Sequence, residues 1–242
     1  MKKLTANFFP ANEITRCANG SDYLGKANIT IANAIRLNGI SVFRDQGGEI
    51  DINFPGFGDG VSYVVPQSKE AYAALRDVVS MAIENENHFG YNSGRYGVEL
   101  NVTGKLVDEP YADGRFSVEV DDICRLYGIT TREVEYSKDG KDKSFTSVDY
   151  PTIGSYEKDG EMQYQTAFEG RISAWKDKEG KDQSFNYDQR LRGMILGERS
   201  SLLKELEQEH TSSLEEKMQG AEARRAGNRA PEPEAPAMEA TR

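Results

Sequence analysis

The chain has 242 residues, with 40 acidic and 30 basic side chains and a net charge of −10. A chain of this length forms one or two domains. The negative net charge excludes nucleic-acid binding by overall electrostatic attraction, and any such contact therefore needs a local basic patch. Two cysteines and two histidines are too few for a disulfide framework or a multi-histidine metal site. Because no apolar run suits a signal peptide or a membrane span, we expect a cytoplasmic protein without metal or cofactor.

The first predicted elements are strands followed by one helix. Apolar and polar residues alternate, as in half-buried strands, over three ranges: 27–31, 35–42 and 50–54. A short strand over 63–65 ends at Pro66. Ser68 is a favoured N-cap, and apolar residues then recur every three or four positions, which predicts a helix over about 68–85.

A second domain follows a linker. Residues 87–97, NHFGYNSGRYG, are rich in glycine and aromatic residues and predict a linker between a domain over 1–86 and a second over 98–210. The second domain contains Asp-Gly pairs between strand-like runs, which predict additional hairpins, and ends in a helix over 188–209. The tail, 211–242, is rich in Pro, Ala and Glu towards its end, and we expect it to be disordered.

The two predicted domains share an internal repeat. GKANITIANAIRLNGI over 25–40 aligns without a gap with GRFSVEVDDICRLYGI over 114–129, at an offset of 89 residues. INFP over 52–55 then matches VDYP over 148–151 after about seven extra residues, which we place in a longer hairpin around residues 138–140. We infer that one module was duplicated and that each copy covers a sheet edge of the other.

The first copy resembles a known family. The strings ITIANAIRLNGISVF, EIDINFP and YVVPQSKEAYAALRDVVSMAI resemble the SpoVG family (stage V sporulation protein G, a septation regulator). The resemblance implies an α+β fold of two tandem SpoVG-like domains. Each would be an antiparallel sheet followed by a C-terminal helix, and together they would form an intramolecular pseudo-dimer. It also implies a small bacterial regulator. Several members of the family bind DNA or RNA.

One feature departs from the family. The family has a basic stretch just after the proline that ends the strand, whereas here neither 56–60 nor 152–155 carries a positive charge. This departure argues against nucleic-acid binding through the usual surface of the family.

Candidate nucleic-acid contacts fall into three sets. Four cations repeat between the copies and could touch phosphates, or could be strand residues paired across a sheet: Lys26, Arg36, Arg115 and Arg125. In the linker, aromatic residues beside Arg95 could stack on unpaired bases, or could anchor the linker: Phe89, Tyr91 and Tyr96. The lysines between 138 and 181 alternate with acids, and we interpret them as solvated turns in which opposite charges cancel.

The sequence indicates no enzyme. We find no nucleophile with a neighbouring base and no phosphate-binding glycine loop before a helix, and Asp121-Asp122 is interpreted as a turn. We expect a SpoVG-like regulator from a bacterium or a mobile element that binds DNA or RNA weakly. The alternative is an acidic protein-interaction module. It could be a phage- or plasmid-encoded, anti-CRISPR-like inhibitor that masks the basic nucleic-acid-binding surface of a host nuclease. No membrane contact is expected, and further oligomerisation stays open.

Overall fold

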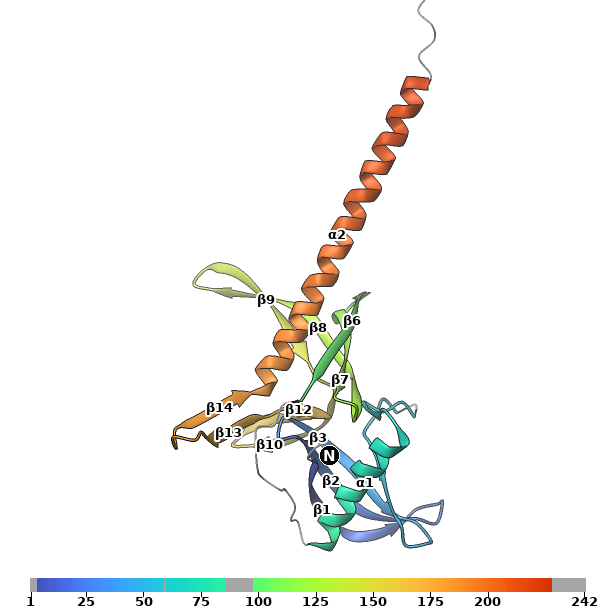
Figure 1. Cartoon of the computed structure of the whole chain (residues 1–242), viewed down its shortest axis with the longest axis vertical. Coiled ribbons are helices and arrows are strands. Elements are labelled where there is room, and N and C mark those ends of the chain that lie inside the picture. Colours follow the sequence, from blue (N-terminus) through green and yellow to red (C-terminus); the bar gives the residue numbers. More distant parts are fainter. Residues whose placement is uncertain (1–3, 59, 86–97, 228–242) are drawn as a thin grey trace, which may run out of the picture. The chain divides into compact units, whose positions relative to one another are not determined.

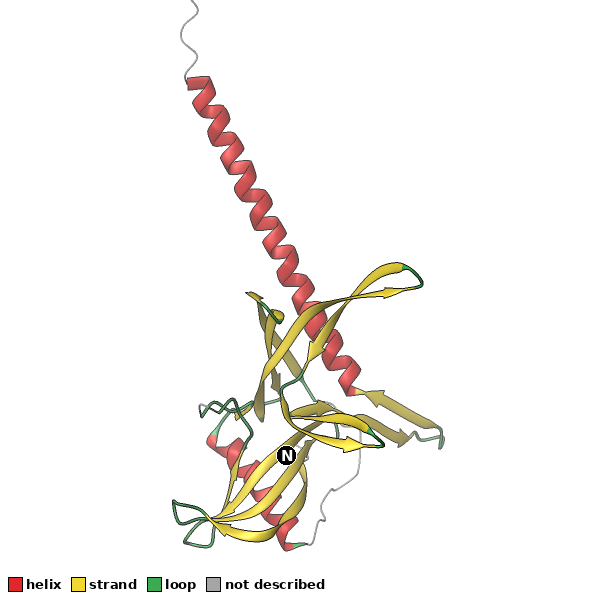
Figure 2. Cartoon of the chain, turned by 180° about the vertical axis from the view of Figure 1, so that it is seen from behind, coloured by secondary structure: helices red, strands yellow, loops and turns green. Residues whose placement is uncertain are grey.

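The computed structural model describes residues 4–58, 60–85 and 98–227. The chain divides into two units, Met1–Ser200 and Ser201–Arg242. The described part is mixed α+β, with mostly antiparallel strands in several sheets and two helices (Figures 1 and 2). The predicted fold class is therefore confirmed at this level.

The first five-stranded sheet is built mainly from the first half of the chain. Its strand order is β1-β2-β3-β12. β4 pairs with the same edge of β3 as β12 does, but farther along β3, at residues 41–44. The strands span these ranges: β1 Leu4–Arg16, β2 Asp22–Ile31, β3 Ile35–Arg44, β4 Ile50–Asn53 and β12 Phe168–Gly170. All of these pairs are antiparallel.

The second five-stranded sheet has the same arrangement. Its strand order is β6-β7-β8-β5. β9 pairs with the same edge of β8 as β5 does, but farther along β8, at residues 130–138. The strands span these ranges: β5 Val64–Pro66, β6 Leu100–Glu109, β7 Ala112–Val120, β8 Cys124–Lys138 and β9 Lys141–Asp149. In both sheets a β-bulge interrupts the pairing of the two repeated strands, between Ala27 and Ile29 in one and between Phe116 and Val118 in the other.

Each sheet takes one strand from the other half of the chain. β5, from the first half, pairs with β8, and β12, from the second half, pairs with β3. The flanking hydrogen bonds repeat as well, because the Asn38 amide donates to the Ala167 carbonyl and the Tyr127 amide donates to the Tyr63 carbonyl, each at 2.8 Å. The two sheets therefore complete one another reciprocally.

Both helices bury apolar side chains. α1 (Lys69–Glu84) begins as predicted, because the Ser68 side chain accepts a hydrogen bond from the Ala71 amide at 3.0 Å. α1 buries these residues: Leu75, Val78, Val79 and Ala82. α2 (Tyr187–Gly227) buries Leu191 and Ile195 near its start. Fully buried aliphatic residues of the repeated strands, among them Ile29, Leu37 and Leu126, complete the core.

The predicted hairpins are present in the second half. β8 and β9, and also β10 (Thr152–Lys158) and β11 (Glu161–Thr166), join through Asp-Gly pairs in which both residues have positive φ, as a type I′ turn requires. β13 (Ile172–Lys176) and β14 (Asp182–Asn186) form a third hairpin. Asp121 and its counterpart Ala32 also have positive φ, which confirms that both lie in tight turns.

Three features differ from the sequence-based expectations or lie outside the described residues. Strands β1 and β6 were not predicted; β1 contains Pro10 and loses its register at a bulge after that residue, which hides the alternation. The predicted disorder of 211–242 is wrong for 211–227, where α2 continues to Gly227, since this stretch is rich in helix formers and contains no proline. The predicted linker, 87–97, lies outside the described residues.

Candidate binding surface

The two repeated arginines lie at equivalent places in the two sheets. In the first sheet Arg36 is opposite Thr30 of β2 and Glu169 of β12. Its Nη1 atom donates to Glu169 Oε1 at 3.1 Å. In the second sheet Arg125 forms an ion pair with Glu119 of β7. The glutamate comes from a different strand in each sheet, yet both guanidinium groups are paired across the sheet, as the structural interpretation of these arginines predicts.

The remaining predicted cations do not gather around these arginines. Arg115 pairs with Glu109, across β6 and β7. Lys26 is exposed on β2, opposite Ser41. The linker residues Phe89, Tyr91, Arg95 and Tyr96 lie outside the described residues. Each predicted site arginine that the structure describes therefore forms an ion pair with a glutamate.

A different basic surface lies on the hairpin of β8 and β9. The last residue of β8 that pairs with β7 is Thr131, and from residue 132 onward β8 pairs only with β9. We call this extension, residues 132–147, the β8–β9 ribbon; it carries the β9 label in Figure 1. It contains the extra residues by which the second copy of the repeat is longer than the first.

The pleat of the ribbon sorts its side chains by charge. Residues directly opposite one another share a face, and alternate residues of one strand do so as well. One face therefore carries Arg132 with Ser147 nearest the sheet, and then the register pairs Val134 with Phe145, Tyr136 with Lys143 and Lys138 with Lys141. We call it the aromatic–lysine face. The opposite face, which we call the acidic face, carries Glu133, Glu135, Ser137, Asp142, Ser144 and Thr146.

Charges that alternate along the chain are thus separated in space. Of the two acids interleaved with the lysines of this hairpin, Asp142 projects from the opposite face and Asp139 lies in the turn. The signal was present in the sequence as the period-two runs EVEY over 133–136 and KDK over 141–143. Counting charge along the chain, without assigning faces, missed it.

Two exposed rings lie among the lysines. The ring centroids of Tyr136 and Phe145 are 5.8 Å apart with an interplanar angle of 68°, an edge-to-face contact. The two residues are 42% and 51% exposed. An edge-to-face pair leaves ring faces free for a further contact.

The acidic face, by contrast, is used within the molecule. It continues the side of the sheet on which Thr131 and Val148 are buried. Glu133 accepts a hydrogen bond from Thr146 at 2.9 Å, and the Arg199 guanidinium of α2 lies 3.7 Å from its carboxylate. Hydrogen bonds from Ser144 and Thr146 lower the pKa of Glu133. The aromatic–lysine face points to the other side of the sheet.

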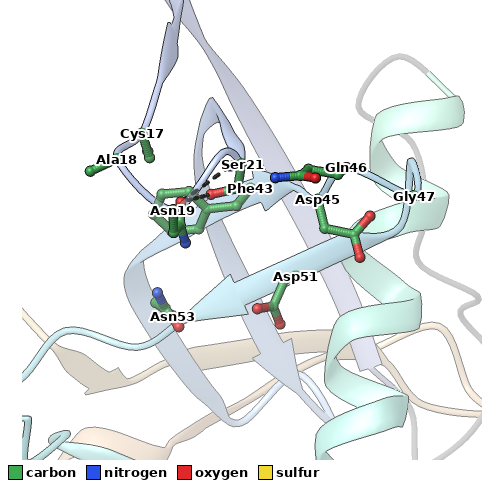
Figure 3. Close-up of a pocket in the computed structure, with 10 residues that line it drawn as sticks. All are labelled: Cys17, Ala18, Asn19, Ser21, Phe43, Asp45, Gln46, Gly47, Asp51 and Asn53. Atoms are coloured by element: carbon green, nitrogen blue, oxygen red, sulfur yellow. Dashed lines mark hydrogen bonds between the residues drawn. The ribbon is translucent and has the colours of Figure 1, made fainter.

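A hollow beside the first sheet offers no comparable chemistry. It holds about 610 Å³ between the β1–β2 and β3–β4 turns, and Figure 3 shows the polar and apolar residues that line it. The Asn19 side chain accepts from Ser21, Asp45 accepts from the Glu49 amide at 2.8 Å, and Asp51 accepts from the Tyr72 hydroxyl. These acceptors stabilise the local turns and the packing of α1.

The remaining acidic and thiol groups of the described residues form no metal cluster, and one of the two thiols is buried. No group of three or more His, Cys, Asp or Glu side chains there is placed to hold a metal ion. Burial, with a smaller contribution from Asp121, raises the pKa of Cys124 to about 12. Over the same residues, no helix is long and apolar enough to span a bilayer.

Comparison of the chain with protein-family models, with curated proteins and with solved structures finds no match.

Proposed function

We propose that the chain is a non-catalytic regulatory protein made of two SpoVG-like copies, and that it binds nucleic acid through the aromatic–lysine face. The repeat over 25–40 and 114–129, the equal strand orders and the reciprocal pairing of β5 and β12 support a duplicated module arranged as an intramolecular pseudo-dimer.

The observation that carries the binding proposal is the sorting of side chains on the β8–β9 ribbon. Three lysines and two exposed aromatic rings share one face: Lys138, Lys141, Lys143, Tyr136 and Phe145. Lysines supply the phosphate contacts that dominate affinity for nucleic acid. A local positive surface of this kind allows an acidic protein to bind nucleic acid despite its net charge of −10.

A second candidate function is binding to a basic protein. Its support is the pairing of Arg36, Arg115 and Arg125 with glutamates, together with the negative net charge. In this alternative the acidic chain covers the nucleic-acid-binding surface of a partner, as expected of a nuclease inhibitor from a mobile element.

The test is fluorescence anisotropy with labelled single- and double-stranded oligonucleotides, in low salt, on the wild-type chain and on the triple variant Lys138→Gln, Lys141→Gln, Lys143→Gln. We expect binding at roughly tens of micromolar protein or below, and in the variant a slope of log affinity against log salt that is shallower by about 2 for single strands. The matched control changes three lysines of the β13–β14 hairpin to Gln: Lys176, Lys178 and Lys181. Absence of binding by the wild type would favour the basic-protein alternative, and equal loss in both variants would remove the ribbon from the site.

A further inference from the structure

We infer that the aromatic–lysine face takes single-stranded rather than duplex nucleic acid, with Tyr136 and Phe145 stacking on unpaired bases. This inference rests on the proposed function, since it names the ligand class of the same face.

The lysines do not distinguish the two ligand classes. An ammonium group contacts the phosphates of a single strand and of a duplex alike, and a two-stranded ribbon also fits the major groove of a duplex. The rings do distinguish them. In a duplex the base faces are stacked against one another, whereas unpaired bases present faces on which aromatic side chains stack.

The register places rings and cations alternately. Tyr136 is directly opposite Lys143 and diagonal to Phe145, while Lys138 and Lys141 form the next pair towards the turn. Each ring therefore has a lysine within one or two positions across or along the ribbon. This alternation suits a strand whose bases lie on the rings while its phosphates meet the lysines.

Competing negative charge is limited on this face. Towards the sheet, the nearest acid on the face is Asp149, whose carboxylate forms an ion pair with Arg132 at 2.9 Å. Asp139 lies in the turn itself. A phosphate backbone that follows the ribbon therefore meets cations and rings over three successive register pairs.

Two exposed tyrosines of another hairpin, Tyr156 and Tyr164, lack this arrangement. On the β10–β11 hairpin, Tyr156 and Tyr164 project from opposite faces, because Tyr156 is opposite Gln163 and Tyr164 is opposite Ser155. Each of those faces also carries a glutamate, Glu161 beside Tyr156 and Glu157 beside Tyr164. These two tyrosines are exposed but not combined with a lysine-rich face, and so provide a matched control.

The experiment measures affinity of the full chain for three probes of equal length: a single-stranded oligonucleotide, its duplex, and an abasic single strand that keeps the phosphates. The test variant is Tyr136→Leu with Phe145→Leu, which keeps apolar bulk on the ribbon, and the control is Tyr156→Leu with Tyr164→Leu. We expect the wild type to prefer the single strand over the other two probes by about tenfold or more. The test variant loses that preference and retains its duplex affinity, while the control variant behaves as the wild type.

The outcomes separate the inference from the function on which it rests. Equal affinity for all three probes, or a test variant that keeps the preference, overturns the inference and leaves nucleic-acid binding in place. Binding of none of the probes contradicts the proposed function itself, and the inference falls with it. Circular dichroism of both double variants verifies that each is folded.

Discussion

Two residues at equivalent places in the repeat, Ile35 and Cys124, are fully buried beside the strands that arrive from the opposite half. Ile35 is opposite Gly170 of β12, and Cys124 is opposite Pro66 of β5. Each lies directly beside a crossing strand, so the thiol of Cys124 can serve as a chemical probe of that crossing.

We predict that only one of the two thiols reacts in the folded protein. Cys17 is partly exposed, whereas Cys124 is buried and burial raises its pKa to about 12, which suppresses the reactive thiolate. Titration with an aromatic disulfide reagent at pH 8 therefore gives one thiol in buffer and two in denaturant. In the Cys17→Ser variant the rapid reaction disappears; a rapid reaction of Cys124 in that folded variant would show that β5 does not cover it.

Single residues also show what the sequence could and could not reveal. The pairing of Arg36 and Arg125 across strands was available from the repeat, because both occupy the same position of a strand with period-two alternation. Their partners were not available. Glu169 is 133 residues from Arg36 in the sequence and comes from a three-residue strand that is too short to show a period.

At the scale of elements, α2 is anchored to the second sheet by a charged contact. Arg199, 17% exposed, donates to Asp113 of β7 through two nitrogens at 3.2 and 2.6 Å, and Thr131 donates to the same carboxylate. Burial raises the pKa of Asp113, but the hydrogen bonds from Arg199 and Thr131 outweigh it and the pKa is lowered.

We predict that Asp113→Asn destabilises the protein in a pH-dependent manner. A lowered pKa in the folded state contributes stability that is present above the ordinary value of about 3.9 and is lost as the pH falls through the folded value. At pH 7 the variant should lose about 1.5–3 kcal/mol of unfolding free energy, the usual contribution of hydrogen bonds to a charged group. Urea unfolding at several pH values from 7 to 3 measures this.

The control for Asp113→Asn is Asp108→Asn, which changes an exposed carboxylate on β6. It should unfold as the wild type does at pH 7. The difference between Asp113→Asn and the wild type should shrink towards pH 3. A difference independent of pH would mean that the Asp113 carboxylate titrates normally in the folded chain.

The element boundaries were predictable where apolar periodicity was strong. The period-two runs over 27–31 and 35–42 and the helix over 68–85 were found, because each buries one regular face. The ribbon was located as an insertion, yet its aromatic–lysine face was not recognised, since a face exists only once the register of β8 against β9 is known. Strand β1 was missed because none of its residues after Ala6 is buried, so no regular buried face shows in the sequence.

At the scale of the first unit, the reciprocal pairing explains why two small sheets occur in one chain. An isolated sheet would leave β3 or β8 with an unpaired segment, which is a hazard for aggregation. Here β12 covers that segment in one sheet and β5 covers it in the other. The arrangement leaves the second copy free to carry the inserted ribbon, on which the proposed binding face lies.

Strands cross between the two halves within one chain, and an engineered disulfide can detect this crossing. Arg36 and Glu169 are directly opposite on β3 and β12, where Cα atoms lie about 4.5–5.5 Å apart, within the range that a disulfide spans. In a Cys17→Ser background, we predict that Arg36→Cys with Glu169→Cys forms an intramolecular disulfide on mild oxidation, detected by peptide mapping without reductant. The pair Lys26→Cys with Glu169→Cys should not form one. A failure of the first pair to link, or links only between separate chains, would contradict the account.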